Sequence, residues 1–139
     1  MIIDAKDLIV GRLGTFVAKQ ALLGEKIDII NSELAVITGK KEMVLAKYKQ
    51  KADRGVPAKG PHYRRQADRF LKRLIRNMLP FKQERGKTAF KNIMCWRGVP
   101  PEFEGKETTK VPGASIEKVP HFRYVKIKDI VKHLGGKVE

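Results

Sequence analysis

The sequence predicts an α/β domain, and two observations support this prediction. A short apolar run at Ile2–Asp4 is followed by a segment with helical spacing and then by a second apolar run at 27–30. Strand, helix and strand joined by short links form a βαβ unit, whose two strands are parallel. The chain has 139 residues, 42% of them hydrophobic, which suits a single domain over 1–139 with a core of its own.

The first helix is expected between these two strands, because apolar residues recur there on one helical face. These residues are Leu13, Phe16, Val17 and Ala21. Gly24 fits the C-terminal end of this helix. A further apolar run at 34–37 predicts another strand, and the basic segment 40–55 predicts a second helix.

The segment 63–80 combines an apolar stripe with a basic stripe. Its apolar residues have the spacing of one face of an α-helix, and they are Ala67, Phe70, Leu71, Leu74, Ile75, Met78 and Leu79. A second face is basic, and it comprises Arg65, Arg69, Lys72, Arg73 and Arg76. Asp68 is the only acidic residue of the segment, so ion pairs within the helix cannot neutralise the basic face. Pro80 marks the end of the helix.

The last third of the chain predicts three further features. QERGKTAF predicts a short helix, and NIMCW that follows it predicts a fourth strand. The stretch 97–121 is charged and contains four prolines, so we expect an extended arm within the domain that is not part of the core. Apolar residues at helical spacing in 127–134 predict a C-terminal helix, and Gly135 fits its end.

The positive charge is concentrated in the middle of the chain. The whole sequence has 30 Lys and Arg against 15 Asp and Glu, and residues 40–92 alone hold 17 of the former and 4 of the latter, a net charge of +13. Such a single-sign field favours a polyanionic partner. No membrane partner is expected, because the apolar face of 67–79 is needed to cover the sheet and no apolar run approaches the roughly 20 residues that span a bilayer.

Among nucleic acids we expect RNA, because the sequence has no helix-turn-helix or zinc-finger pattern. The loop KGPHYRR offers charge beside the ring of Tyr63, which either stacks on an unpaired base or packs at the start of the helix. The candidate RNA-binding residues are Lys40, Lys41, Lys47, Lys49, Lys51, Arg54, Lys59, His62, Tyr63, Arg64, Arg65, Arg69, Lys72, Arg73, Arg76, Lys82, Arg85 and Lys87.

Two glycine motifs resemble nucleotide-binding loops but are incomplete. Gly86-Lys87-Thr88 ends like a phosphate-binding P-loop, yet Phe81 stands where the first glycine of that loop is required. GRLG contains half of a dinucleotide fingerprint, and we expect it to serve tight packing of a strand against a helix.

The residues that commonly act in catalysis are scattered. His62, His121 and His133 are far apart and lack metal-ligand spacing. The single Cys95 is expected to be a small buried apolar residue in a reducing cytosol. The sequence therefore predicts no enzyme, no metal site and no cofactor.

Three stretches make the sequence specific: VGRLGTFVAK, INSELAVITGKK, and IRNMLPFKQERGKTAFKNIMCWRGVPPEF. In this order they closely resemble the large-subunit ribosomal protein thirteen family, the universal L-thirteen proteins, over residues 1 to about 135. Ile75 to Gly86 looks like the family signature. The short link from Gly24 to Ile27 and the lack of a long C-terminal extension resemble the archaeal type. The chain departs from the archaeal Arg-Pro-Asp-Arg pattern at RQADR, 65–69, where the helix begins.

The resemblance implies a three-layer α/β/α domain with a four-strand, mainly parallel sheet, completed by the arm 97–121 and the C-terminal helix. It also implies a structural constituent of the large ribosomal subunit that binds large-subunit (23S-type) rRNA through the basic surface and supports early subunit assembly in translation. Neighbouring large-subunit ribosomal proteins are the other expected partners, with no small-molecule substrate. The expected location is cytoplasmic, in the ribosome, and the arm is expected to order on contact with rRNA or those proteins.

The residues alone leave two other classes of function open. A nucleotide-binding enzyme would use the C-terminal edge of the sheet, with ITGKK at a phosphate. A protein adaptor would use the basic face to bind an acidic protein.

Overall fold

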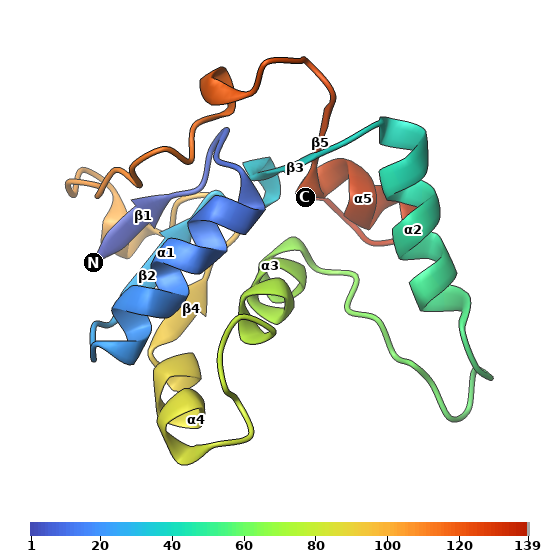
Figure 1. Ribbon diagram of the computed structural model, residues 1–139, viewed down its shortest axis with the longest axis horizontal. Helices are drawn as coiled ribbons and strands as arrows, with labels where there is room; N and C mark the ends of the chain where they lie inside the picture. The colour runs from blue at the N-terminus through green and yellow to red at the C-terminus, as the bar shows by residue number, and fades with distance from the viewer. Residues whose placement is uncertain (139) are drawn as a thin grey trace.

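The first two predicted strands and the helix between them form the expected βαβ unit. In the computed structural model, which describes residues 1–138, β1 (Ile2–Asp4) and β2 (Ile27–Ile30) pair in parallel. Helix α1 (Val10–Leu22) connects them, and Gly24 follows its end at a φ of 98° that favours glycine. β4 (Ile93–Cys95) pairs in parallel with the other side of β2, which gives the order β1-β2-β4 (Figure 1).

The strand predicted at 34–37 does not join this sheet. A short 3-10 helix, η1 (Ser32–Leu34), turns the chain after β2, and Asn31 before it has a left-handed φ of 53°. β3 (Val36–Thr38) then pairs antiparallel with β5 (Tyr124–Lys126). The predicted four-strand sheet is therefore not confirmed, because the described strands form a three-stranded parallel sheet and a separate two-stranded sheet. β5 was not predicted, since three residues are too few to show strand alternation.

The remaining helices follow the predicted order, three of them with shorter bounds. They are α2 (Lys41–Asp53), α3 (Ala67–Arg76), α4 (Glu84–Lys91) and α5 (Ile127–His133). α3 begins only at Ala67, so the basic loop before it is not helical. α5 continues directly from β5 and packs against both α2 and α3, and Gly135 follows its end at a φ of 88°.

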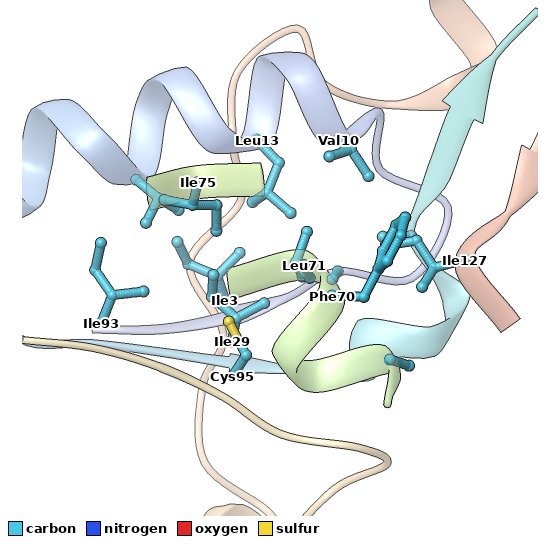
Figure 2. Close-up of a cluster of buried hydrophobic side chains, with 14 of the residues drawn as sticks. Ile3, Val10, Leu13, Ile29, Phe70, Leu71, Ile75, Ile93, Cys95 and Ile127 are labelled. Atoms are coloured by element: carbon cyan, nitrogen blue, oxygen red, sulfur yellow. The ribbon is translucent and has the colours of Figure 1, made fainter. Parts of the chain in front are cut away.

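The core lies between the parallel sheet and helices α1 and α3. Leu13 of α1 and Leu71 and Ile75 of α3 are fully buried, and they face Ile3 and Ile93 of the strands (Figure 2). The apolar face predicted for α3 is thereby confirmed at its centre. Leu74 and Met78, at the edges of the same face, are only partly buried and exposed, respectively.

The opposite face of the parallel sheet is less covered than a three-layer fold requires. Ile2, Asp28 and Met94 are aligned across the three strands. Ile2 and Asp28 are only partly buried and Met94 is 42% exposed. Within residues 1–138 a complete third layer over this face is therefore not present.

The stretch 97–121 packs back onto the domain, and the expected extended arm is not confirmed. It contains two short 3-10 helices, η2 (Pro101–Phe103) and η3 (Ile116–Lys118). The backbone N–H of Thr109 donates to the carbonyl of Ile2 (2.7 Å), and the N–H of Ile9 donates to the carbonyl of Ala114 (2.8 Å). Ala114 and Val111 are buried in the main core, so the expectation that this segment lies outside the core is wrong at these two residues.

Two glycines let neighbouring segments approach closely. A Cβ at Gly14 would lie 2.6 Å from Sδ of Met78, and a Cβ at Gly86 would collide with the carbonyl oxygen of Pro80. The tight packing expected of GRLG is therefore present at Gly14, but its partner is the turn after α3 and not a strand. Met78, Pro80 and Gly86 all lie inside the stretch that resembles the family signature, which gives that signature a packing role.

Candidate nucleic-acid interface

Helix α2 presents loosely held positive charge. It buries only Val44 and Tyr48, while Lys41, Lys47 and Lys49 are exposed to solvent. Lys51 is the exception, because its ammonium lies 5.4 Å from the centre of the Tyr48 ring. Burial, and then the charges of Lys47 and Arg54, lower the pKa of Lys51 below its ordinary value. The lowered pKa therefore reflects first the partial burial of Lys51 and second the positive charges placed near it.

Helix α3 holds its cations against aromatic rings. The guanidinium of Arg73 lies 4.7 Å from the centre of the Tyr63 ring, and that of Arg76 lies 4.8 Å from the centre of the Phe81 ring. The ammonium of Lys72 lies 4.8 Å from the centre of the Phe90 ring. A cation over a ring face is attracted by its quadrupole, by about 0.5–1 kcal/mol at exposed sites. These three side chains are partly buried, so their charges are held in defined places.

These cations surround an open depression of about 440 Å³. It is lined by His62, Arg64, Arg69, Lys72, Arg73, Arg76 and Phe90. None of these lining residues is acidic, and Asp68, the one acidic residue of α3, instead faces Arg97 at 3.9 Å. Six of the predicted RNA-binding residues thus meet around one cavity that has the electrostatics of an anion site.

Other predicted residues lie outside this depression. Arg54, Tyr63 and Arg65 line a second cavity of about 510 Å³, which His62 also lines, so the two cavities adjoin. Lys59 is exposed in the loop that leads from α2 to α3, and Lys40 lies at the far end of α2, away from both cavities. The predicted basic surface is therefore extended, with the depression at one part of it.

The residues around α4 are the least organised of the predicted set. Lys87 forms an exposed ion pair with Glu84 at 3.9 Å, which contributes little in water. Nε of Arg85 donates to the side-chain oxygen of Gln83 (3.1 Å), and Lys82 is exposed. These cations remain accessible, but nothing in the described residues fixes their direction toward the depression.

Two aromatic residues of this interface, Phe81 and Phe90, were missed by the sequence analysis. Each of them is an aromatic residue inside a basic segment, and these segments were predicted only as helix or turn. Tyr63 was considered, and its ring packs near Phe70 (6.4 Å between centres) while Arg73 covers it. Of the two roles left open for Tyr63, the structure favours packing.

The motif fragments do not form a nucleotide site like those they resemble. The space beside Gly86 is filled by the carbonyl of Pro80, and ITGKK follows a strand of the antiparallel pair, not of the parallel sheet. Cys95 is buried as predicted, and burial raises the pKa of its thiol to about 12. A thiol that stays protonated is a poor nucleophile. None of the helices in the described chain is long and apolar enough to cross a membrane.

Comparison with known proteins identifies the family of this chain. The family described as "Ribosomal protein L13" matches residues 1–102. "Large ribosomal subunit protein uL13" of Archaeoglobus fulgidus is 44% identical over 135 residues, covering 96% of this chain and 86% of that protein. The proteins of the same name from Methanococcoides burtonii and Thermoplasma acidophilum are 40% and 41% identical, covering 98% and 97% of this chain and 98% of each relative. The identity extends over nearly the whole chain, so the chain belongs to the ribosomal protein L13 family, with archaeal relatives.

Proposed function

We propose that this protein is a structural constituent of the large ribosomal subunit and binds large-subunit rRNA through α2, the loop 54–66, α3 and α4. The observation that supports this best is the depression beside α3, whose lining combines five Lys and Arg side chains with no acidic residue. The relatives are named for the large subunit, which supplies the class of polyanion. Neighbouring ribosomal proteins are the second class of partner, and the location is the ribosome in the cytoplasm.

The mechanism is electrostatic and structural. Lys and Arg side chains neutralise phosphates where RNA segments approach each other, and the release of condensed counterions supplies much of the affinity. Arg73 and Arg76 add directionality, because a planar guanidinium that is already placed on a ring loses less freedom when it binds a phosphate. By holding two RNA segments together, such a surface supports early folding of the subunit.

The test is to purify the tagged protein from its host at low salt, with and without ribonuclease, and to sequence the RNA and identify the proteins that co-purify. We expect large-subunit rRNA and its proteins, both lost after ribonuclease treatment. A matched variant with Arg69, Lys72, Arg73 and Arg76 all replaced by Gln should recover much less rRNA while remaining folded by circular dichroism. A partner protein that resists ribonuclease, without rRNA, would overturn the proposal in favour of an adaptor.

A further inference from the structure

One aromatic side chain stands apart from the core and from the basic depression. Phe122 is 97% exposed, more than any other large apolar residue of the described chain. A single exposed apolar residue is common on protein surfaces and by itself indicates nothing. The surroundings of Phe122 are what distinguish it.

The antiparallel pair β3–β5 brings Phe122 beside a motif that the sequence analysis singled out. Thr38 is aligned with Tyr124, and beyond the strands the N–H of Gly39 donates to the carbonyl of Arg123 (2.9 Å). Gly39 has a φ of 133°, so the extended pairing ends there, and Lys40 and Phe122 are the residues that flank this last hydrogen bond. In Figure 1 the chain enters β5 next to the segment that leads from β3 into α2.

The charge around this aromatic tip is positive. His121, Arg123, Lys40 and Lys41 are all exposed. Of the nearby acidic residues, Asp7 pairs with Lys126 at 3.5 Å, and Glu42 lies in the first turn of α2. Phe122 is therefore an exposed ring with Arg123 beside it on its own segment and two exposed lysines on the neighbouring segment.

We propose that Phe122 stacks on an unpaired base of single-stranded RNA, while Lys40, Lys41 and Arg123 contact the phosphates beside that base. Aromatic rings that bind single strands use the face of a base, which is inaccessible in a duplex, and the cations follow the backbone. An apolar protein partner would not need these surrounding cations, and an acidic protein would not need the aromatic ring. The inference rests on the proposed function. It adds a second RNA contact, whose aromatic residue lies outside the basic segment 40–92.

The experiment measures binding of the full chain to a fluorescent oligouridine of roughly 12 nucleotides, a length within the range of known single-strand sites. Phe122→Ala should weaken binding about tenfold, since the base no longer stacks on a ring, and Phe122→Trp should restore it. Replacing Lys40 and Lys41 by Gln should instead flatten the salt dependence, by roughly 0.7 for each phosphate that is no longer neutralised. Leu23→Ala is the matched control, because Leu23 is 71% exposed at the end of α1 and lies on a different element.

Two further measurements separate this inference from the proposed function. Binding to an RNA duplex should be unchanged by Phe122→Ala, because the base faces of a duplex are covered. Binding to large-subunit rRNA should remain salt-dependent in every variant. If oligouridine binds the wild type and Phe122→Ala equally, or binds neither, the stacking site is overturned while rRNA binding stands. If the wild type does not bind rRNA either, the proposed function itself fails.

Discussion

Helix α2 buries two of its residues, Val44 and Tyr48, whereas the shorter α3 buries four. Both helices are strongly basic, yet most lysines of α2 extend into solvent while three of the cations of α3 lie on aromatic rings. The difference shows two ways of making a positive surface. In α3 the core fixes the helix and the rings fix the charges, so geometry is defined before RNA binds. In α2 the charges are free to adapt, and they add attraction with little directionality.

The largest expected effect comes from breaking the core side of α3. Leu71 is fully buried, so Leu71→Asp should place an unpaired charge in the core and cost several kcal/mol, enough to unfold the domain. Leu74→Asp is the matched control on the same helix, and it should cost clearly less because Leu74 is only partly buried. Urea unfolding followed by circular dichroism measures both. A Leu71→Asp protein with an unchanged midpoint would contradict the core assignment of α3.

The next effect compares the two basic faces directly. One variant replaces Arg69, Lys72, Arg73 and Arg76 by Gln, and the other replaces Lys41, Lys47, Lys49 and Lys51 by Gln. Both should flatten the salt dependence of rRNA binding by roughly 0.7–0.9 for each phosphate that is no longer neutralised. The α3 variant should lose more affinity at a given salt concentration, because its charges are already positioned. Equal losses of affinity from the two variants would show that net charge alone matters. The proposed difference between positioned charges on α3 and free charges on α2 would then be wrong.

A smaller effect isolates the aromatic support from the charge. Phe90→Leu removes the ring under Lys72 and leaves every charge in place. Affinity for rRNA should fall about two- to fivefold, because Lys72 is no longer held in place and must be ordered on binding, while the salt slope should not change. Phe103→Leu is the control, since Lys106 lies 5.6 Å from the centre of the Phe103 ring and neither residue lines the depression. A changed slope in Phe90→Leu would mean that the charge itself has moved.

The smallest effect concerns the ionisation of Lys51. Because burial and the charges of Lys47 and Arg54 lower its pKa, Lys47→Gln should raise that pKa toward its ordinary value. Binding of a polyanion should raise it as well, so binding at high pH should take up protons. The folded state holds this proton less tightly than the unfolded chain does. The free energy of unfolding therefore rises as the pH rises through the lowered pKa of Lys51. NMR titration of the Lys51 side chain measures each shift, and a pKa that falls on binding would contradict this account.

The local features of the fold could be predicted from the sequence, and the distant pairings could not. The βαβ unit and the buried centre of α3 follow from periodicity, and the ends of α1 and α5 follow from Gly24 and Gly135. The pairing of β3 with β5 joins segments far apart in the chain, and strands this short have no periodicity to reveal it. The burial of Val111 and Ala114 was hidden by the prolines and charges around them.

In the candidate site, too, local features could be predicted and contacts between distant elements could not. The cations that line the depression were predicted from their helical spacing, because neighbours on one helix face are fixed by the helix itself. The rings of Phe81 and Phe90 reach those cations from outside α3, so no spacing within α3 indicates them. The contact of Arg97 with Asp68 likewise crosses between elements. The packing of one element against another is not visible in the spacing of residues along the chain.

The antiparallel pair of β3 and β5 has a consequence for the order in which the molecule is made. β3 and α2 are synthesised early, but the strand that pairs with β3 comes only at Tyr124–Lys126, after α3, α4 and β4. Since domains fold from the N-terminus as they emerge, the βαβ unit can assemble while translation continues, and α2 acquires its support from β5 and α5 only after those two elements have been made. The growing polypeptide therefore displays its basic segments before they are fixed in place.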